Sequence, residues 1–469
     1  MPCWTPVSKT ESSRNTDKLQ LMENSYNDNN LIVGLDIGTT KIATVVGYRN
    51  ENGQIFVTGH GVSKSTGVEF GEIRNINRTV EGILRSKTLA EQHANFNIQN
   101  VYVGIAGHHI KTSKYSRHLY RYSNKSPITQ DEIDKMKEDV FEVAVPPGEK
   151  IIDVIPQRYL IDNVPAKDTD IVGMLGNEII GIYQIVTGKE QEIEKIVLCG
   201  NQAELALNEI ILEPLASGLA CLSEEEKRSG VALVDIGGGT TDLIIYVDGS
   251  PVYTKVISLG GNVITHDIAE VCKISEEVAE KLKVSFGTCV VDKSNENNLI
   301  TIPRNHGQEP IQINENYLAQ IINCRVQEEI LQSIKKEIDN SGYKDRLFSG
   351  IVLTGGGANL KHLRELCQFT LQMPTRIGLP DNGFSKNIPS DLKQPMFATA
   401  LGLLKYGIET EEATRVKNGT EDEKKSDKVH IFGKEKGNRQ KHTDKNQKKN
   451  WGFFDKVHDW LMSTLDNVY

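Results

Sequence analysis

The chain has 469 residues, 38% of them hydrophobic, and a formal net charge of −9. That length and hydrophobic fraction are typical of a globular protein with two or more domains. Residues 424–449 contribute +7 and the remainder carries −16, so the acidic body argues against a general nucleic-acid partner. The seven cysteines form no CxxC pair and have no metal-ligand spacing, which indicates reduced core residues.

The first thirty residues are polar and contain no apolar run of the kind that a secretion signal needs. We expect this segment to be disordered, and Met22 offers a second start of translation. Apolar runs and a helical pattern then predict three strands, at about 31–37, 42–48 and 55–62, and a helix from about Asn77 to Gln92.

A glycine-containing turn joins the first two of these strands. It reads Gly34-Leu35-Asp36-Ile37-Gly38-Thr39-Thr40-Lys41. Glycine lets the backbone bring its N–H groups close to an anion, and Thr39, Thr40 and Lys41 add further donors for phosphate. Because an aspartate repels phosphate, Asp36 is expected to act through a magnesium ion that retains several waters. Taken alone, this turn is equally well explained as an ordinary tight hairpin.

A second turn of the same type follows a strand at 231–236. It reads Asp235-Ile236-Gly237-Gly238-Gly239-Thr240-Thr241-Asp242. Its three glycines and two threonines suit phosphate, and Asp235 is the second candidate for magnesium. Strands at 243–248 and 252–258 and helices near 262–272 and 275–285 come next. The order of strand, turn, strand, strand and helix therefore occurs twice, and two facing turns are able to hold a nucleotide's phosphates from both sides.

A third glycine turn ends a buried-type strand in Ile351-Val352-Leu353-Thr354-Gly355-Gly356-Gly357-Ala358. Such a turn suits contact with a nucleotide's sugar or base, so Gly355, Gly356, Gly357 and Ala358 are predicted there. No GxxxxGKS loop occurs in the chain, and the spacing of the three motifs does not fit a single βαβ unit. Both observations argue against P-loop and Rossmann chemistry.

These motifs, in this order, resemble the two phosphate motifs and the adenosine motif of the actin and heat-shock-chaperone ATPase superfamily. The resemblance implies an α/β, ribonuclease H-like fold with duplicated domains around a central nucleotide cleft. Glu213, before Pro214, resembles the glutamate that orients the attacking water, although it also suits a simple helix start. Glu280 and Lys283, three apart on a predicted helix, resemble the pair that cradles adenosine.

Within the superfamily, the chain resembles FtsA, the family of actin-like bacterial cell-division proteins, over about 31–407 and again at its C-terminal end. Residues 67–73 resemble that family's turn into its first long helix, and 101–110 resemble the opening of its extra subdomain. The resemblance implies seven segments. They are a disordered extension (1–30), the start of the first half (31–95), an SHS2-like extra subdomain (96–171), the completion of the first half with a connecting helix (172–230), the second half (231–407), a disordered basic linker (408–450) and an amphipathic helix (451–469).

The last segment has apolar side chains at helical spacing. They are Phe453, Phe454, Val457, Trp460, Leu461 and Leu465. A helix over 451–465 is about 22 Å long, too short to span a bilayer but suited to its interface. The preceding basic residues 424–449 include almost no apolar side chains, so they favour a linker attracted to anionic lipid. The alternative is that the helix packs back on the protein's own core.

By this resemblance, the protein binds ATP and magnesium between its halves and polymerises through actin-like contacts. Its terminal helix attaches the polymer to the cytoplasmic face of the inner membrane at the division site. There it holds the C-terminal peptide of the tubulin-like protein FtsZ, and other division proteins, during septum formation. ATP hydrolysis is expected to be slow if it occurs, with Asp36, Asp235 and Glu213 as its catalytic candidates.

Three other classes share parts of this pattern. A soluble small-molecule kinase shares the loops but has no use for a tethered amphipathic helix. A heat-shock chaperone needs a large peptide-binding domain, for which the residues after Gly402 leave too little chain. A pilus-type actin-like adaptor shares the fold and the membrane context, but the motif at 101–110 and the terminal helix disfavour it.

Overall fold

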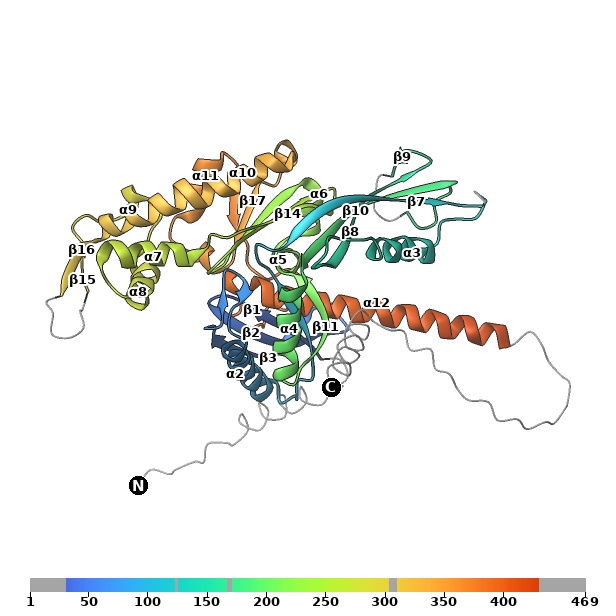
Figure 1. The fold of residues 1–469 in the computed structure, drawn as a ribbon, viewed down its shortest axis with the longest axis horizontal. Helices are drawn as coiled ribbons and strands as arrows, with labels where there is room; N and C mark the ends of the chain where they lie inside the picture. Colours follow the sequence, from blue (N-terminus) through green and yellow to red (C-terminus); the bar gives the residue numbers. More distant parts are fainter. Residues whose placement is uncertain (1–30, 123–124, 167–170, 303–309, 430–469) are drawn as a thin grey trace, which may run out of the picture.

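The computed structural model describes residues 31–122, 125–166, 171–302 and 310–429. These residues form two α/β halves and a smaller subdomain, which lies at the opposite end of the long axis from α8, β15 and β16 (Glu276–Phe286, Leu299–Ile302 and Ile311–Asn314; Figure 1). The predicted N-terminal extension and terminal amphipathic helix lie outside the described residues.

The first half is built on a five-stranded sheet in the order β11-β6-β1-β2-β3. Its strands are β1 (Ile32–Ile37), β2 (Lys41–Arg49), β3 (Ile55–Lys64), β6 (Asn100–Ile105) and β11 (Ala206–Leu212). Helices α2 (Ile76–Ala94) and α4 (Glu190–Gln202) pack on one face, and α5 (Glu213–Cys221) and α12 (Ala398–Val429) pack on the other. Both faces of the sheet are therefore buried, which suits its apolar strands.

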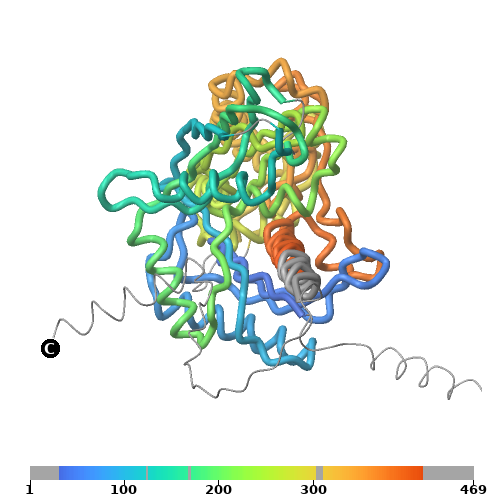
Figure 2. Tube along the Cα trace, turned by 90° about the vertical axis from the view of Figure 1, so that its right-hand side faces the viewer, coloured from blue at the N-terminus to red at the C-terminus, as the bar shows by residue number. Residues whose placement is uncertain are grey.

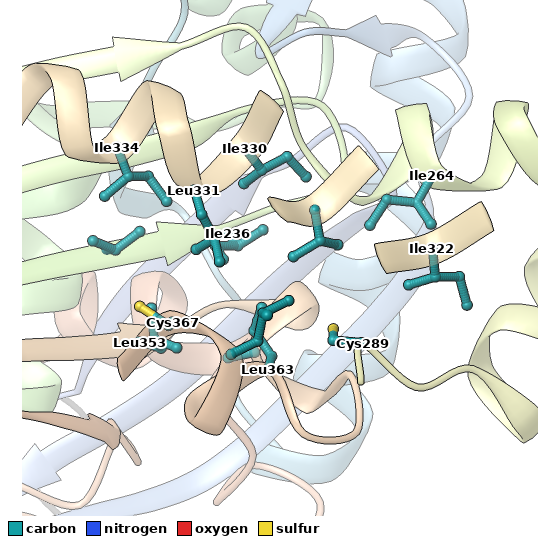
Figure 3. Close-up of a cluster of buried hydrophobic side chains, with 14 of the residues drawn as sticks. Ile236, Ile264, Cys289, Ile322, Ile330, Leu331, Ile334, Leu353, Leu363 and Cys367 are labelled. Atoms are coloured by element: carbon teal, nitrogen blue, oxygen red, sulfur yellow. The ribbon is translucent and has the colours of Figure 1, made fainter. Parts of the chain in front are cut away.

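The second half is built on a sheet in the order β14-β13-β12-β17-β18. Its strands are β12 (Val231–Ile236), β13 (Thr241–Val247), β14 (Ser250–Ile257), β17 (Ile351–Thr354) and β18 (Thr375–Ile377). Besides α8, the helices of this part of the chain are α6 (Glu224–Ser229), α7 (Gly261–Cys272), α9 (Glu315–Arg325), α10 (Leu331–Ser341) and α11 (Leu363–Leu371). Side chains of α7, α9, α10 and α11 enclose one core with this sheet (Figure 3). Ile322, Ile330 and Ile334 are all buried in this core.

The two sheets have the same topology. In each, three antiparallel strands meander (β1–β3 and β12–β14), and two later strands add in parallel beside the first (β6 and β11, β17 and β18). The predicted internal duplication is therefore confirmed. In both halves the glycine turn lies between the first two strands, so each turn emerges at the same end of its sheet.

The extra subdomain has a four-stranded sheet in the order β7-β10-β8-β9, covered by one helix. Its elements are β7 (Lys111–Tyr120), α3 (Gln130–Phe141), β8 (Glu149–Ile161), β9 (Val164–Pro165) and β10 (Glu178–Lys189). The predicted range of 96–171 is displaced at both ends. Residues 100–105 form β6, which pairs with β1 in the first half, and β10 lies beyond the predicted exit. The pairing of β6 with β1 and of β10 with β8 decides the two boundaries of the subdomain, and sequence alone does not reveal these pairings.

The last helix, α12, corrects two further boundaries. It follows the second half in the chain but packs on the first, where Leu401 and Leu404 join Ala43 and Val45 in one core cluster. It also runs to Val429, although residues from 408 onward were expected to form a disordered linker. Polar contacts with the first half help to hold this continuation of the helix, since Glu412 accepts a 2.6 Å hydrogen bond from Arg49. Figure 1 shows α12 crossing the first half and projecting beyond it, and Figure 2 shows the start of the helix nearly end-on beside the strands of that half.

Candidate functional site

The first glycine turn holds a buried aspartate beside a lysine. The N–H of Gly38 donates to the carbonyl oxygen of Lys41 at 3.0 Å, which closes the β1–β2 hairpin. Asp36, at the end of β1, is 3% exposed, and its carboxylate pairs with the Lys41 ammonium group. Lys41, predicted to hold phosphate, is thus engaged with Asp36 in this structure. The negative charge of Asp36 and the positive charge of Lys41 therefore balance each other at the base of the turn.

The second turn is closed in the same way and is held from behind by a helix. Gly237 N–H donates to the Thr240 carbonyl at 2.9 Å. The carbonyls of Gly237 and Gly238 in turn accept 2.8 Å hydrogen bonds from the first N–H groups of α7, those of Gly261 and Asn262. Because these carbonyls point into the helix N-terminus, the turn is fixed before any ligand binds.

The two turns meet. A Cβ atom added to Gly238 would lie 2.2 Å from Cγ2 of Thr40, and one added to Gly239 would lie 2.7 Å from Oγ1 of Thr39. Neither position therefore accepts a side chain without moving the opposite turn. This contact brings the two halves together at their loops, and it explains the glycines at positions 238 and 239.

Four carboxylates converge on a small cavity beside this contact. It has a volume of about 80 Å³, and Asp36, Asp235, Asp242 and Glu213 are among its lining residues. Burial raises the pKa of Asp235, Asp242 and Glu213, and the neighbouring carboxylates raise the pKa of the latter two further, well above the ordinary range. Oδ1 of Asp242 is buried without a hydrogen-bond partner. Such a pocket favours a cation.

Oxygen donors of this kind fit magnesium, which prefers carboxylate and water oxygens. Among the described residues, no three side chains of the His, Cys, Asp and Glu types converge closely enough to hold a metal by themselves. A magnesium ion at Asp36 and Asp235 would therefore take most of its ligands from water and phosphate. When bound, it would supply charge neutralisation for phosphate oxygens.

A second, larger cavity of about 470 Å³ adjoins the acidic one. Thr40, Gly237, Gly238, Gly356 and Met396 line both, so the two form one continuous cleft. The size of the larger cavity suits a small organic ligand.

Glu280 and Lys283, predicted to cradle adenosine, line the larger cavity from α8. Lys283 Nζ lies 2.7 Å from the Glu280 carboxylate and donates to the carbonyl of Gly261 at 2.8 Å and to the hydroxyl of Thr265 at 2.7 Å. Burial lowers the pKa of Lys283, and the Glu280 carboxylate opposes that shift. The pair therefore ties α8 to the start of α7.

The remaining predicted residues divide between the two cavities. Gly38, Thr39, Gly239, Thr240 and Gly355 line the acidic cavity, whereas Gly357 lines the larger one. Two predicted residues lie elsewhere. The hydroxyl of Thr241 donates to the carbonyl of Leu259 at 2.7 Å, and Ala358 packs in the core of the second half. Each lies one residue from a cavity-lining neighbour, and its side chain turns away from the cleft.

Several lining residues were absent from the predicted site. Asp242 was available from the sequence, because it ends the second motif and pairs with Asp235 across the hairpin. Asn262, Lys361 and Gln394 line the larger cavity, and Thr399 the smaller, but no local pattern marks them. They arrive through tertiary packing of α7, α12 and the loops near α11.

Glu213 stands at the start of α5 and faces the acidic cavity. A Cβ atom on Gly104, in β6, would lie 2.8 Å from Cγ of Glu213. The bare backbone of β6 thus leaves room for this carboxylate beside Asp36 and Asp242. Its place permits it to orient a water molecule near phosphate, the role that the resemblance to the actin superfamily implies.

Comparisons with known proteins agree with this architecture. The family described as "Cell division protein FtsA" matches residues 232–402, and the one described as "SHS2 domain inserted in FTSA" matches 107–187, the region of the extra subdomain. The cell division protein FtsA of Borreliella burgdorferi is 35% identical over 404 residues, covering 85% of this chain and 96% of the relative.

Two solved structures share the fold. The type IV pilus biogenesis complex PilM–PilN aligns with a TM-score of 0.58 at 17% identity, covering 80% of this chain and 98% of that one. MreB5 of Spiroplasma citri bound to ADP aligns with a TM-score of 0.50 at 15% identity, covering 83% and 99%. The predicted actin-like α/β fold is confirmed. With a relative this similar over nearly its whole length, the chain belongs to the FtsA family of cell-division proteins.

Proposed function

We propose that this protein binds ATP with magnesium in the cleft between its halves, polymerises, and links the division protein FtsZ to the cytoplasmic membrane. One observation carries the nucleotide part: two glycine turns meet beside a cavity lined by four carboxylates, which opens into a second cavity of about 470 Å³. The phosphates occupy the acidic side with the magnesium ion, and the adenosine occupies the larger side.

Each residue type then has a task. Backbone N–H groups and hydroxyls of the two turns bind phosphate oxygens, while Asp36 and Asp235 orient magnesium-bound water. Lys41 exchanges part of its pairing with Asp36 for phosphate. Glu213 orients a water molecule in line with the terminal phosphate. Hydrolysis by these groups, if it occurs, is slow, because ATP serves mainly to hold the polymerising shape of the protein.

The membrane part rests on the sequence beyond the described residues. Among the described helices, none is long and apolar enough to cross a bilayer. The apolar face formed by Phe454, Val457, Trp460 and Leu461 inserts into the interface, and the basic residues before it attract anionic lipid. One such helix binds weakly, so attachment depends on a polymer that presents many copies. Nucleotide-controlled assembly thereby controls membrane attachment.

The partner of the polymer is the C-terminal peptide of FtsZ. We place its contact surface in the small subdomain of the second half, between residues 264 and 344, and recruitment of further division proteins follows at the septum. The FtsA relatives support this role because they are cell division proteins.

Co-sedimentation with anionic liposomes tests the proposal. The full chain and a chain ending at Asn450 are each compared with and without ATP and magnesium. We expect only the full chain to bind, and ATP to increase its binding. Equal binding of the two chains would overturn the anchoring role of the terminal helix.

A further inference from the structure

A strained hairpin turn lies over the phosphate loops. Strands β4 (Val68–Glu69) and β5 (Glu72–Ile73) are joined by the two residues Phe70 and Gly71, with φ values of +51° and +75°. Two-residue turns with both φ angles positive favour Asn-Gly or Asp-Gly, so a phenylalanine at the first position is strained. Such strain persists only where the surroundings hold the backbone in place.

Those surroundings are the two phosphate turns. The N–H of Gly71 donates to Oγ1 of Thr39 at 3.1 Å. A Cβ atom on Gly239 would lie 2.9 Å from both N and Cα of Phe70. Gly71 also lines the acidic cavity. The turn at 70–71 is therefore a third wall of this cavity, in contact with the loop from each half.

Directly behind the turn, a buried carboxylate faces two histidines. Glu72 is 3% exposed, and its oxygens lie 3.0 Å from Arg74, 2.8 Å from Nδ1 of His108 and 3.4 Å from Nδ1 of His109. His109 is also buried, and neither of its ring nitrogens has a hydrogen-bond partner. Its contact with Glu72 is thus close packing, so a displacement of Glu72 acts directly on the buried ring.

His109 stands where the chain enters and leaves the extra subdomain. It precedes β7, the first strand, and a Cβ atom on Gly188, in the last strand β10, would lie 3.3 Å from its Cδ2. On the other side, a Cβ atom on Gly71 would lie 3.2 Å from the N atom of Gly107. The turn and the base of the extra subdomain are therefore packed closely against the same residues, Gly107 and His109.

A cavity of about 10 Å³ completes this path. Glu72, His109, Glu192 and Glu213 are among its lining residues. It is large enough for about one water molecule. Since Glu213 also lines the acidic cavity, the buried groups behind the turn are contiguous with the phosphate site.

We propose that the Phe70–Gly71 turn is a third loop of the phosphate site, that it positions Thr39, and that Glu72 and His109 couple its position to the base of the extra subdomain. This inference rests on the proposed binding of ATP. Loss or gain of the terminal phosphate moves Thr39 and the turn together. Because packed groups shift as units, the change reaches both strand ends of the extra subdomain.

The positioning role is tested with two alanine variants of matched strain. Gly71 and Gly53 have nearly the same φ, +75° and +77°, but Gly53 has no atom within 4 Å of an added Cβ. Gly71→Ala in the full chain should weaken magnesium-ATP binding roughly threefold to tenfold, the worth of one hydrogen bond. Gly53→Ala should bind like the unmodified chain. Equal affinities of the two variants would overturn the positioning role.

The coupling is tested by hydrogen exchange with Glu72→Gln, which keeps the side chain's shape. In the unmodified chain, amides at 106–112 and 187–190 should exchange at different rates with ATP and with ADP. Glu72→Gln should bind ATP within about twofold of normal and lose this difference. Persistence of the difference in the variant, or its absence from the unmodified chain, would refute the coupling. Failure of the unmodified chain to bind ATP would instead overturn the proposed function, and this inference with it.

Discussion

The hydroxyl of Ser217 donates a 2.6 Å hydrogen bond to Oδ2 of Asp235, and both side chains are buried. The Thr399 hydroxyl lies 3.3 Å from the same oxygen. Burial raises the pKa of Asp235, while the hydrogen bond from Ser217 lowers it and so favours the ionised form. Ser217 belongs to α5 and Thr399 to α12, so helices packed on the first half orient a carboxylate of the second.

Replacing Ser217 with alanine should weaken magnesium-dependent ATP binding roughly tenfold, because Asp235 loses its strongest orienting donor. Nucleotide affinity measured by titration calorimetry in EDTA should stay close to normal, since the loops still bind phosphate. Asp235→Ala should produce a larger loss of the same kind. An equal loss with and without magnesium would place the metal elsewhere.

Asp242→Asn should stabilise the nucleotide-free protein by about 1–2 kcal/mol, because it removes a buried charge beside Asp235 and Asp36. The same change should weaken magnesium-ATP binding. Urea unfolding measures the first effect, with Asp248→Asn as the control: it lies on the same hairpin but is exposed, and its ion pair with Arg346 contributes little. A destabilised Asp242→Asn variant would contradict the view that burial beside other carboxylates makes Asp242 destabilising.

A pH effect is expected at the far side of the first half, where Tyr406 of α12 donates a 2.8 Å hydrogen bond to Glu209. Burial raises the pKa of Glu209, although this hydrogen bond opposes the shift. The folded state therefore holds a proton that the unfolded state has lost, so this group's contribution to stability falls as pH rises from about 4.3 through the folded pKa.

Glu209→Gln should flatten that part of the pH profile. Urea midpoints between pH 4.5 and 8 provide the measurement. A profile that keeps its full slope in the variant would assign the effect to another group.

Phe454→Glu combined with Trp460→Glu should release the full chain from anionic liposomes, because two charges cannot enter the interface with the apolar face. ATP affinity should not change. Gly452→Glu with Ser463→Glu adds the same charge on the opposite side of the helix and serves as the control. Retained liposome binding by the first variant would refute the anchor.

Local pattern was enough to predict the strands and the glycine turns. The turns at Gly38 and Gly237 are marked by their own residues, and the repeated order of elements marks the duplication. The partner of β6 was not predictable, because strand pairing is decided by contacts distant in the sequence. For the same reason, sequence did not predict that Met396 and Thr399 line the cleft or that Ser217 binds Asp235.

Other differences from the predicted site concern single residues within one motif. Thr241 and Ala358 belong to motifs that line the cleft, but neighbouring residues in a strand or tight turn point in different directions. The continuation of α12 past residue 408 was not predicted, because its polar side chains are typical of a solvent-exposed linker. Glu411 and Glu412 instead meet Tyr102 and Arg49.

The packing of α12 also constrains how the chain folds during synthesis. A Cβ atom on Gly34 would lie 2.7 Å from the N atom of Leu404, so β1 and α12 touch backbone to backbone. The first strand to leave the ribosome therefore waits for one of the last helices before its sheet is covered. Until then an apolar sheet face is exposed, and a nascent chain halted before residue 400 would be a substrate for chaperones.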